Sequence, residues 1–210
     1  MSVIHRHAPD RRHATDRATH TTAGLVQDEI VTTSLARRAL AVLRISFGLT
    51  FLWAFFDKTF ALGFHTGWVT NPETGEETLD RFGDAAWING GSPTEGFLSF
   101  GVNPDSPFAS FFNNLAGYAV VDWLFMLGLL GIGLTLTLGV GMRIGAIAGA
   151  LMYLMMYAAV MVPENNPVFD DHLIGAISVV VLALTLAGDT WGLGRRWSKT
   201  EMVQRHPILK

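Results

Sequence analysis

The chain has 210 residues, of which 50% are hydrophobic, and its mean hydropathy is +0.32. This composition is too apolar for an ordinary soluble domain with a charged shell, so it predicts a membrane protein. The net charge of −3 gives no basic field that would bind nucleic acid, and the lack of cysteine excludes disulfides, thiolate metal sites and dithiol redox pairs.

The first 38 residues are rich in His, Arg, Thr and Asp and contain no sustained apolar run. They offer neither a folded core nor the apolar region of a signal peptide, so we expect 1–38 to be a mostly disordered tail. The histidines of this tail are not at compact metal-ligand spacing. A second, shorter tail is expected at 198–210.

Four apolar segments follow, each about 20 residues long, which is enough to cross a hydrocarbon core of about 30 Å. They lie at about 39–62, 120–141, 143–162 and 168–188. The expected fold is an all-α integral membrane protein, in which a domain at 39–197 forms a bundle of four transmembrane helices. Recurring glycines in the second and third segments would let neighbouring helices approach closely. They are Gly128, Gly131 and Gly133, and Gly141, Gly145 and Gly149.

Basic residues predict the orientation of these segments. Most of the 15 lysines and arginines lie in the two tails and in the short turn between the second and third segments. With four spans these positions fall on one side of the membrane, and the positive-inside rule makes that side the cytoplasm. We therefore expect a multi-pass protein of the plasma membrane with cytoplasmic N- and C-termini.

The long loop at 63–119 would then face outward, and its sequence predicts partial structure. A turn centre at 71–75 between β-compatible pieces indicates a small hairpin. The Ser-Pro pairs at 92–93 and 106–107 are typical helix starts. We expect two short helices along the outer membrane surface, where they would cover whatever opens there.

Six ionisable residues gather at the outward ends of the apolar segments: Asp57, Lys58, Asp122, Asp170, Asp171 and His172. Helix capping explains part of this set, because helix ends stabilise carboxylates at N-termini and cations at C-termini. The others lie at a depth that costs several kcal/mol unless they are paired or hydrated. Two explanations therefore remain open: a polar pocket in the outer leaflet, or helix capping combined with snorkelling of the side chains to the interface. The candidate catalytic residues are Asp57, Lys58, Asp170, Asp171 and His172.

Four further residues are candidates for binding a quinone: Arg44, Asp122, Tyr153 and Tyr157. Arg44 would either pair with Asp189 or anchor an anionic or carbonyl head group. Tyr153 and Tyr157 share a helix face beside several methionines, a pattern that suits a quinone slot or ordinary core filling. The single histidine in the segments is too few for haem b, and no flavin or metal motif is evident.

Several motifs together resemble the DoxX/DoxD family over about residues 37–197. They are "AAWINGGSPTEGFLSFG" in the loop, "DWLFMLGLLGIGLTLTLGVGMR" as the second segment, "NPVFDDHLI" opening the fourth and "TWGLGRRW" closing it. The resemblance implies a protein like the large subunit of thiosulfate:quinone oxidoreductase, which oxidises thiosulfate to tetrathionate on the outer side and passes electrons to membrane quinone. It also implies partners, either a small periplasmic subunit or respiratory and oxidative-stress complexes.

Three functions remain open at this point. The first is a DoxX-type membrane subunit of a quinone-linked oxidoreductase, with quinone entering between helices and an acid of the fourth segment relaying protons. The second is a non-catalytic accessory subunit of a respiratory or oxidative-stress membrane complex. The third is a small-solute carrier, which the lack of a visible internal repeat disfavours.

Overall fold

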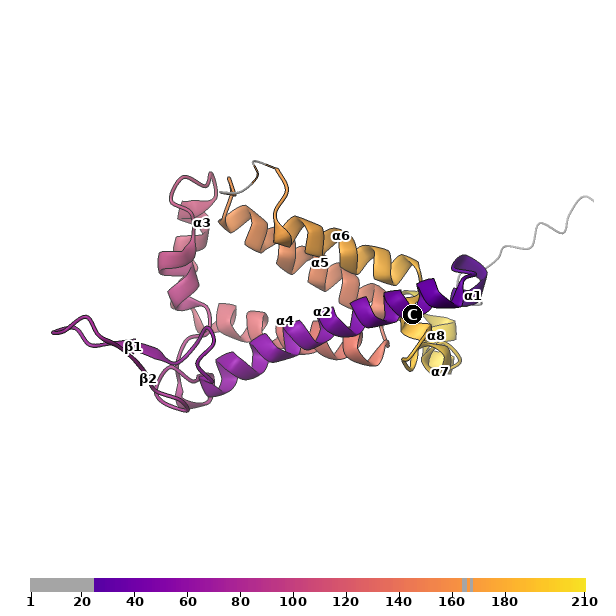
Figure 1. The fold of residues 1–210 in the computed structure, drawn as a ribbon, viewed down its shortest axis with the longest axis horizontal. Coiled ribbons are helices and arrows are strands. Elements are labelled where there is room, and N and C mark those ends of the chain that lie inside the picture. The colour runs from indigo at the N-terminus through magenta and orange to yellow at the C-terminus, as the bar shows by residue number, and fades with distance from the viewer. Residues whose placement is uncertain (1–24, 164–165, 167) are drawn as a thin grey trace, which may run out of the picture.

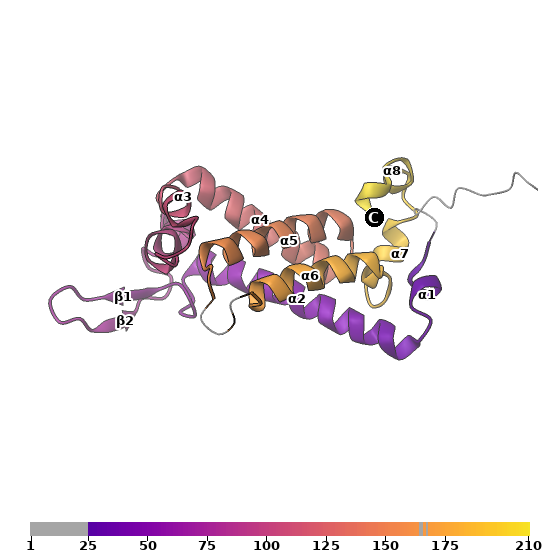
Figure 2. The ribbon, with the colours of Figure 1, turned by 90° about the horizontal axis from the view of Figure 1, so that it is seen from above.

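The computed structural model describes residues 25–163, 166 and 168–210, and this part of the chain is mostly helical. Its long helices are α2 (Ser34–Phe60), α4 (Ala119–Leu138), α5 (Met142–Ala159) and α6 (Asp171–Leu184). They run side by side, with the 61–118 loop at one end and α1 (Gln27–Ile30) and the C-terminus at the other (Figures 1 and 2). We call these the loop end and the termini end.

Three of the helices, α2, α4 and α5, are long and apolar enough to cross a membrane. Many large apolar side chains on their surfaces are exposed, as expected for helices that face lipid. The fourth helix, α6, is apolar but has 14 residues, which is about 21 Å at 1.5 Å per residue. Among the described residues, the structure therefore supports a membrane protein with three candidate spans.

The helix α6 is shorter than the expected segment at 168–188 for two local reasons. It begins after Asp170, whose Oδ1 accepts a hydrogen bond from the Leu173 N–H at 2.9 Å and so caps the first turn. It ends where Leu186 takes a left-handed φ of 50°, and a 3₁₀ turn, η4 (Ala187–Asp189), follows. This bend directs backbone carbonyls toward α2.

The helices pack as two pairs, α2 with α4 and α5 with α6, which meet mainly through α4 and α5. Glycines permit the closest approaches. A Cβ at Gly48 would lie 2.6 Å from the backbone nitrogen of Thr137, and one at Gly145 would lie 2.9 Å from the Thr135 Cβ. The expected role of glycine in packing is confirmed for Gly145. It is wrong for Gly131, where a Cβ would meet no atom within 4 Å.

The buried core joins the four long helices and a smaller cluster fixes the loop. The main cluster includes Phe51, Met126, Leu129, Ile132, Leu136, Val179 and Leu182. The second cluster packs Leu98, Val102 and Phe112 of the loop against Ala159 at the end of α5. The loop is therefore anchored to the helices by apolar contacts.

The loop contains the expected hairpin and three short helical turns. Strands β1 (Trp68–Thr70) and β2 (Glu77–Leu79) pair antiparallel and project beyond the helices (Figure 1). They are followed by η2 (Trp87–Asn89), by η3 (Phe97–Gly101) and by α3 (Ala109–Asn113). The first Ser-Pro pair leads to η3, a π-helical turn, rather than to an α-helix.

Parts of both expected tails, 1–38 and 198–210, are folded. Gln27 is fully buried and α2 begins at Ser34, inside the segment expected to be disordered. At the other end, α7 (Gly194–Trp197), α8 (Glu201–Arg205) and η5 (Pro207–Leu209) fold back against the termini end. The expected disorder of 1–24 lies outside the described residues.

Candidate functional site

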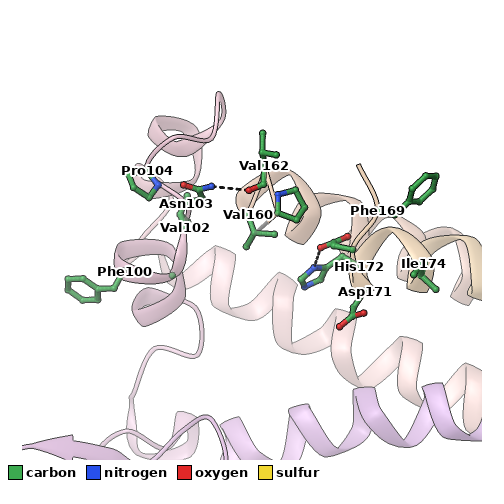
Figure 3. Close-up of a pocket in the computed structure, with 13 residues that line it drawn as sticks. Phe100, Val102, Asn103, Pro104, Val160, Val162, Phe169, Asp171, His172 and Ile174 are labelled. Carbon is green, nitrogen blue, oxygen red and sulfur yellow. Dashed lines mark hydrogen bonds and ion pairs between the residues drawn. The ribbon is translucent and has the colours of Figure 1, made fainter. Parts of the chain in front are cut away.

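A pocket of about 630 Å³ lies at the loop end, between η3, the end of α5 and the start of α6 (Figure 3). Its polar lining includes Asn103, Asp170, Asp171 and His172. Its volume falls in the range of about 300–1,000 Å³ that is typical of small-molecule sites. The structure thus brings together three of the candidate catalytic residues, all from the start of α6.

Asp170 and His172 form a tight pair in this pocket. The Nδ1 atom of His172 lies 2.6 Å from Asp170 Oδ2, and the ring points into the space below the loop (Figure 3). Because an ionised carboxylate only accepts hydrogen bonds, the proton sits on Nδ1 and the other ring nitrogen, Nε2, is available to a ligand. The second carboxylate oxygen of Asp170, Oδ1, accepts the Leu173 N–H at 2.9 Å, so both oxygens of this side chain have a partner.

Asp171 and Tyr153 complete the surroundings of His172. The Asp171 carboxylate is exposed and directed into the same space (Figure 3), and it accepts no hydrogen bond from the described residues. The Tyr153 ring lies 6.4 Å from the His172 ring and 5.3 Å from the Phe51 ring, between centroids. The Tyr153 ring therefore lies between the His172 ring and Phe51 of α2 and packs against both.

Asp57 and Lys58 do not line the pocket. Both carboxylate oxygens of the buried Asp57 accept backbone N–H groups, from Phe64 at 3.1 Å and His65 at 3.0 Å, and so hold the chain reversal after α2. Lys58 is half-buried and makes no hydrogen bond or ion pair with the described residues. Lys58 therefore does not pair with Asp170 or Asp171, the acids at the start of α6.

Asp122 connects the loop to α4 and lies outside the pocket lining. Its Oδ1 accepts hydrogen bonds from the Ser92 hydroxyl at 2.9 Å, the Thr94 N–H at 3.1 Å and the Thr94 hydroxyl at 2.7 Å. These bonds account for the Ser-Pro-Thr part of the loop motif. They also occupy the carboxylate that was a candidate for binding quinone.

Arg44 lies in the first half of α2, outside the pocket lining, and is fully buried. Its guanidinium donates to five backbone carbonyls, those of Leu136, Thr137, Ala187, Thr190 and Trp191. The expected ion pair with Asp189 is replaced by these bonds, and Asp189 instead accepts the Gln27 N–H at 3.0 Å. Arg44 thus has no free N–H for a head group.

Tyr157 holds the wall of the pocket without lining it. Its hydroxyl donates to the Val168 carbonyl at 2.8 Å and so joins α5 to the segment before α6. Of the two tyrosines predicted to share a slot, Tyr153 contacts a pocket residue through its ring, which lies against His172.

Sequence reasoning missed the residues that fix the loop over the pocket. The Asn103 side-chain amide donates to the Met161 carbonyl at 3.1 Å, and the Ser106 hydroxyl donates to the Ala158 carbonyl at 2.7 Å. Both residues are near prolines that predict turns, but a turn signal does not reveal which distant carbonyls its side chains will reach.

Fold and pocket together define a helical membrane protein with a polar pocket at its loop end. Among the described residues, no group of three or more His, Asp or Glu side chains is placed to hold a metal ion. No family model matches the chain, and no curated protein and no solved structure matches it. The resemblance to the DoxX/DoxD family therefore stays a prediction.

Proposed function

We propose that the chain is a DoxX-type membrane subunit of a quinone-linked oxidoreductase and that the loop-end pocket is its quinone site. The observation that carries this proposal is the Asp170–His172 pair, at 2.6 Å, beside Asp171 at the start of an otherwise apolar helix. Ionisable groups at such positions are costly, and they commonly mark ligand sites or proton pathways.

The residues of the pocket fit a quinone head group. Its ring is flat and apolar and carries two carbonyl oxygens that accept hydrogen bonds. The apolar lining offered by Val102, Val160 and Ile174 suits the ring, and a charged His172 has Nε2–H available as a donor.

Residues of the pocket would supply the protons that quinone reduction consumes. A bound quinone supplies the electron-accepting chemistry, which consumes two protons for every two electrons. His172 can release a proton from Nε2 while Asp170 holds the ring orientation and stabilises its charged form. Asp171 is exposed and can exchange protons with water.

The proposed topology has four spans, with both termini in the cytoplasm and the pocket facing outward. It treats α6 and its flanking residues as the fourth span, because a short apolar helix is accommodated by local thinning of the bilayer. Charge supports the orientation. Arg195, Arg196 and Lys199 lie at the termini end, whereas Glu73 and Glu76 lie on the hairpin.

The resemblance makes thiosulfate the first electron donor to test. Joining two thiosulfate ions as tetrathionate releases two electrons, which balances the reduction of one quinone.

We would incubate the protein in nanodiscs with thiosulfate and decylbenzoquinone and follow quinone reduction by absorbance. We expect His172→Ala and Asp171→Asn each to lower kcat by about 100-fold, the size of a lost acid–base group. The control Lys199→Ala alters an exposed cation at the termini end. Wild-type rates in both site variants would refute the site.

A second candidate function is an accessory subunit that recruits a partner through its hairpin. An isolated two-stranded hairpin is marginally stable in water, yet β1 and β2 project from the helices with Trp68 and Val69 exposed. This function predicts a stoichiometric complex in native membranes that Trp68→Ser disrupts, together with no quinone reduction by the isolated chain. Reduction by the isolated chain would rule out a purely accessory role.

A further inference from the structure

The side of the pocket that faces the loop is lined by a well-anchored segment, residues 100–104. Asn103 and Ser106 donate hydrogen bonds to carbonyls at the end of α5. The Asn103 N–H also donates to the Ala159 carbonyl at 3.0 Å. Leu98, Val102 and Phe112 are buried against Ala159 beneath this segment. Entry from the loop side would require these contacts to break.

The lateral side of the pocket is continuous with a surface that faces lipid. Ile174 lines the pocket and is 54% exposed. Further along α6, Ile177, Val181 and Leu184 are among the exposed apolar residues. Spacings of three and four residues put all four on one face of the helix. Ile174 is thus both a wall of the pocket and the first residue of an exposed apolar stripe, which we call the α6 stripe.

Exposed aromatic residues lie at the edge of the pocket, although its interior is polar. Phe100 and Phe169 are exposed and point away from the cavity, whereas His172 and Asp171 point into it (Figure 3). Exposed aromatic residues near the ends of membrane helices favour the lipid–water boundary. The polar groups would therefore be reached from the acyl-chain region across an apolar edge.

Building on the proposed quinone site, we infer that the pocket is filled sideways from the lipid leaflet at the loop end, past Ile174. The ligand is then an amphiphile whose head group lies at His172 and whose hydrocarbon tail lies on the α6 stripe. This arrangement selects for quinones that carry a tail, because only these gain contacts with Ile177 and Val181.

Photo-crosslinking tests this inference without relying on turnover. Photoreactive benzoylphenylalanine replaces Ile177 in one variant and Leu151 in another, since both are exposed apolar residues and Leu151 lies on α5, outside the pocket lining. The probe is a benzoquinone with an alkyne-tagged decyl tail, in nanodiscs. We expect labelling at 177 to saturate and to be competed by untagged decylbenzoquinone, and labelling at 151 to rise linearly with probe. Linear labelling at both positions would overturn the inference.

A kinetic test uses the size of residue 174. Ile174→Trp narrows the lateral entrance, so we expect KM for decylbenzoquinone to rise about tenfold and KM for the same ring without a tail to change much less. The control Leu151→Trp should leave both unchanged. Equal effects on the two quinones, or none, would contradict lateral entry. Saturable labelling at 177 without any quinone reduction would reject the proposed oxidoreductase function and support lateral entry. Quinone reduction together with linear labelling at 177 would support the proposed function and reject lateral entry.

Discussion

At the scale of single residues, Arg44 illustrates how a buried cation is stabilised without a carboxylate. Five N–H groups of its guanidinium meet five carbonyls, and the four longer contacts measure 2.9–3.3 Å. Two of the carbonyls belong to the end of α4, where the helix dipole places negative partial charge. A Cβ at Gly139 or Gly192 would lie 2.8 or 2.4 Å from the Gly188 carbonyl oxygen, which explains glycine at both positions, and 3.1 Å from a guanidinium nitrogen.

Arg44→Lys should destabilise the protein, although the charge is kept. Lysine has three donors, so at least two buried carbonyls would lose their partner, at a cost of about 2–4 kcal/mol. Thermal unfolding in detergent measures this effect against Arg38→Lys, a matched change at an exposed position of the same helix. Equal melting temperatures for the two variants would contradict the assigned role.

At the scale of elements, apolar length was enough to predict α2, α4 and α5, and turn residues predicted the hairpin. The roles of Asp122 and Arg44 could not be predicted in the same way. Asp122 bonds to Thr94, 28 residues earlier, and Arg44 reaches carbonyls up to 147 residues away. Backbone carbonyls carry no sequence signal, so a polar residue in an apolar segment indicates a partner without identifying it. The start of α6 was predictable as a polar cluster because its contacts are local.

Close helix approach predicts opposite outcomes for two glycine-to-alanine changes. Gly48→Ala would push a Cβ against the backbone of α4 and should cost about 1–3 kcal/mol, as overpacking does. Gly131→Ala meets no neighbouring atom within 4 Å and should be neutral, or stabilising by about 0.5–1 kcal/mol through helix propensity. Unfolding curves of the two variants under one condition provide the comparison. A Gly131→Ala variant as unstable as Gly48→Ala would show that α4 packs differently.

At the scale of the whole molecule, the two ends of the helices differ in chemistry. The termini end is tied together by Arg44 and by contacts between the N-terminal segment and the C-terminal turns, such as the Thr190 hydroxyl to the Gln27 side chain at 2.6 Å. The loop end carries the acidic hairpin and the pocket. The termini end is therefore filled by internal hydrogen bonds around a buried cation, while the loop end contains a polar pocket.

Because the chain has no cysteine, single-cysteine variants report topology directly. In intact cells with the protein in the plasma membrane, a membrane-impermeant maleimide should label Glu73→Cys at the hairpin. It should label Lys199→Cys only after permeabilisation, because both positions are exposed but lie at opposite ends. Labelling of Lys199→Cys in intact cells would reverse the proposed orientation.

The proposed binding of a quinone at His172 can be measured at equilibrium, which needs neither an electron donor nor a partner subunit. Decylbenzoquinone would be titrated calorimetrically into the protein in nanodiscs, with empty nanodiscs subtracted. We predict one saturable site in the wild type and in Lys199→Ala, and an affinity at least about tenfold weaker in His172→Ala, or about 1.4 kcal/mol. An unchanged affinity in His172→Ala, or no saturable binding to the wild type, would contradict the account.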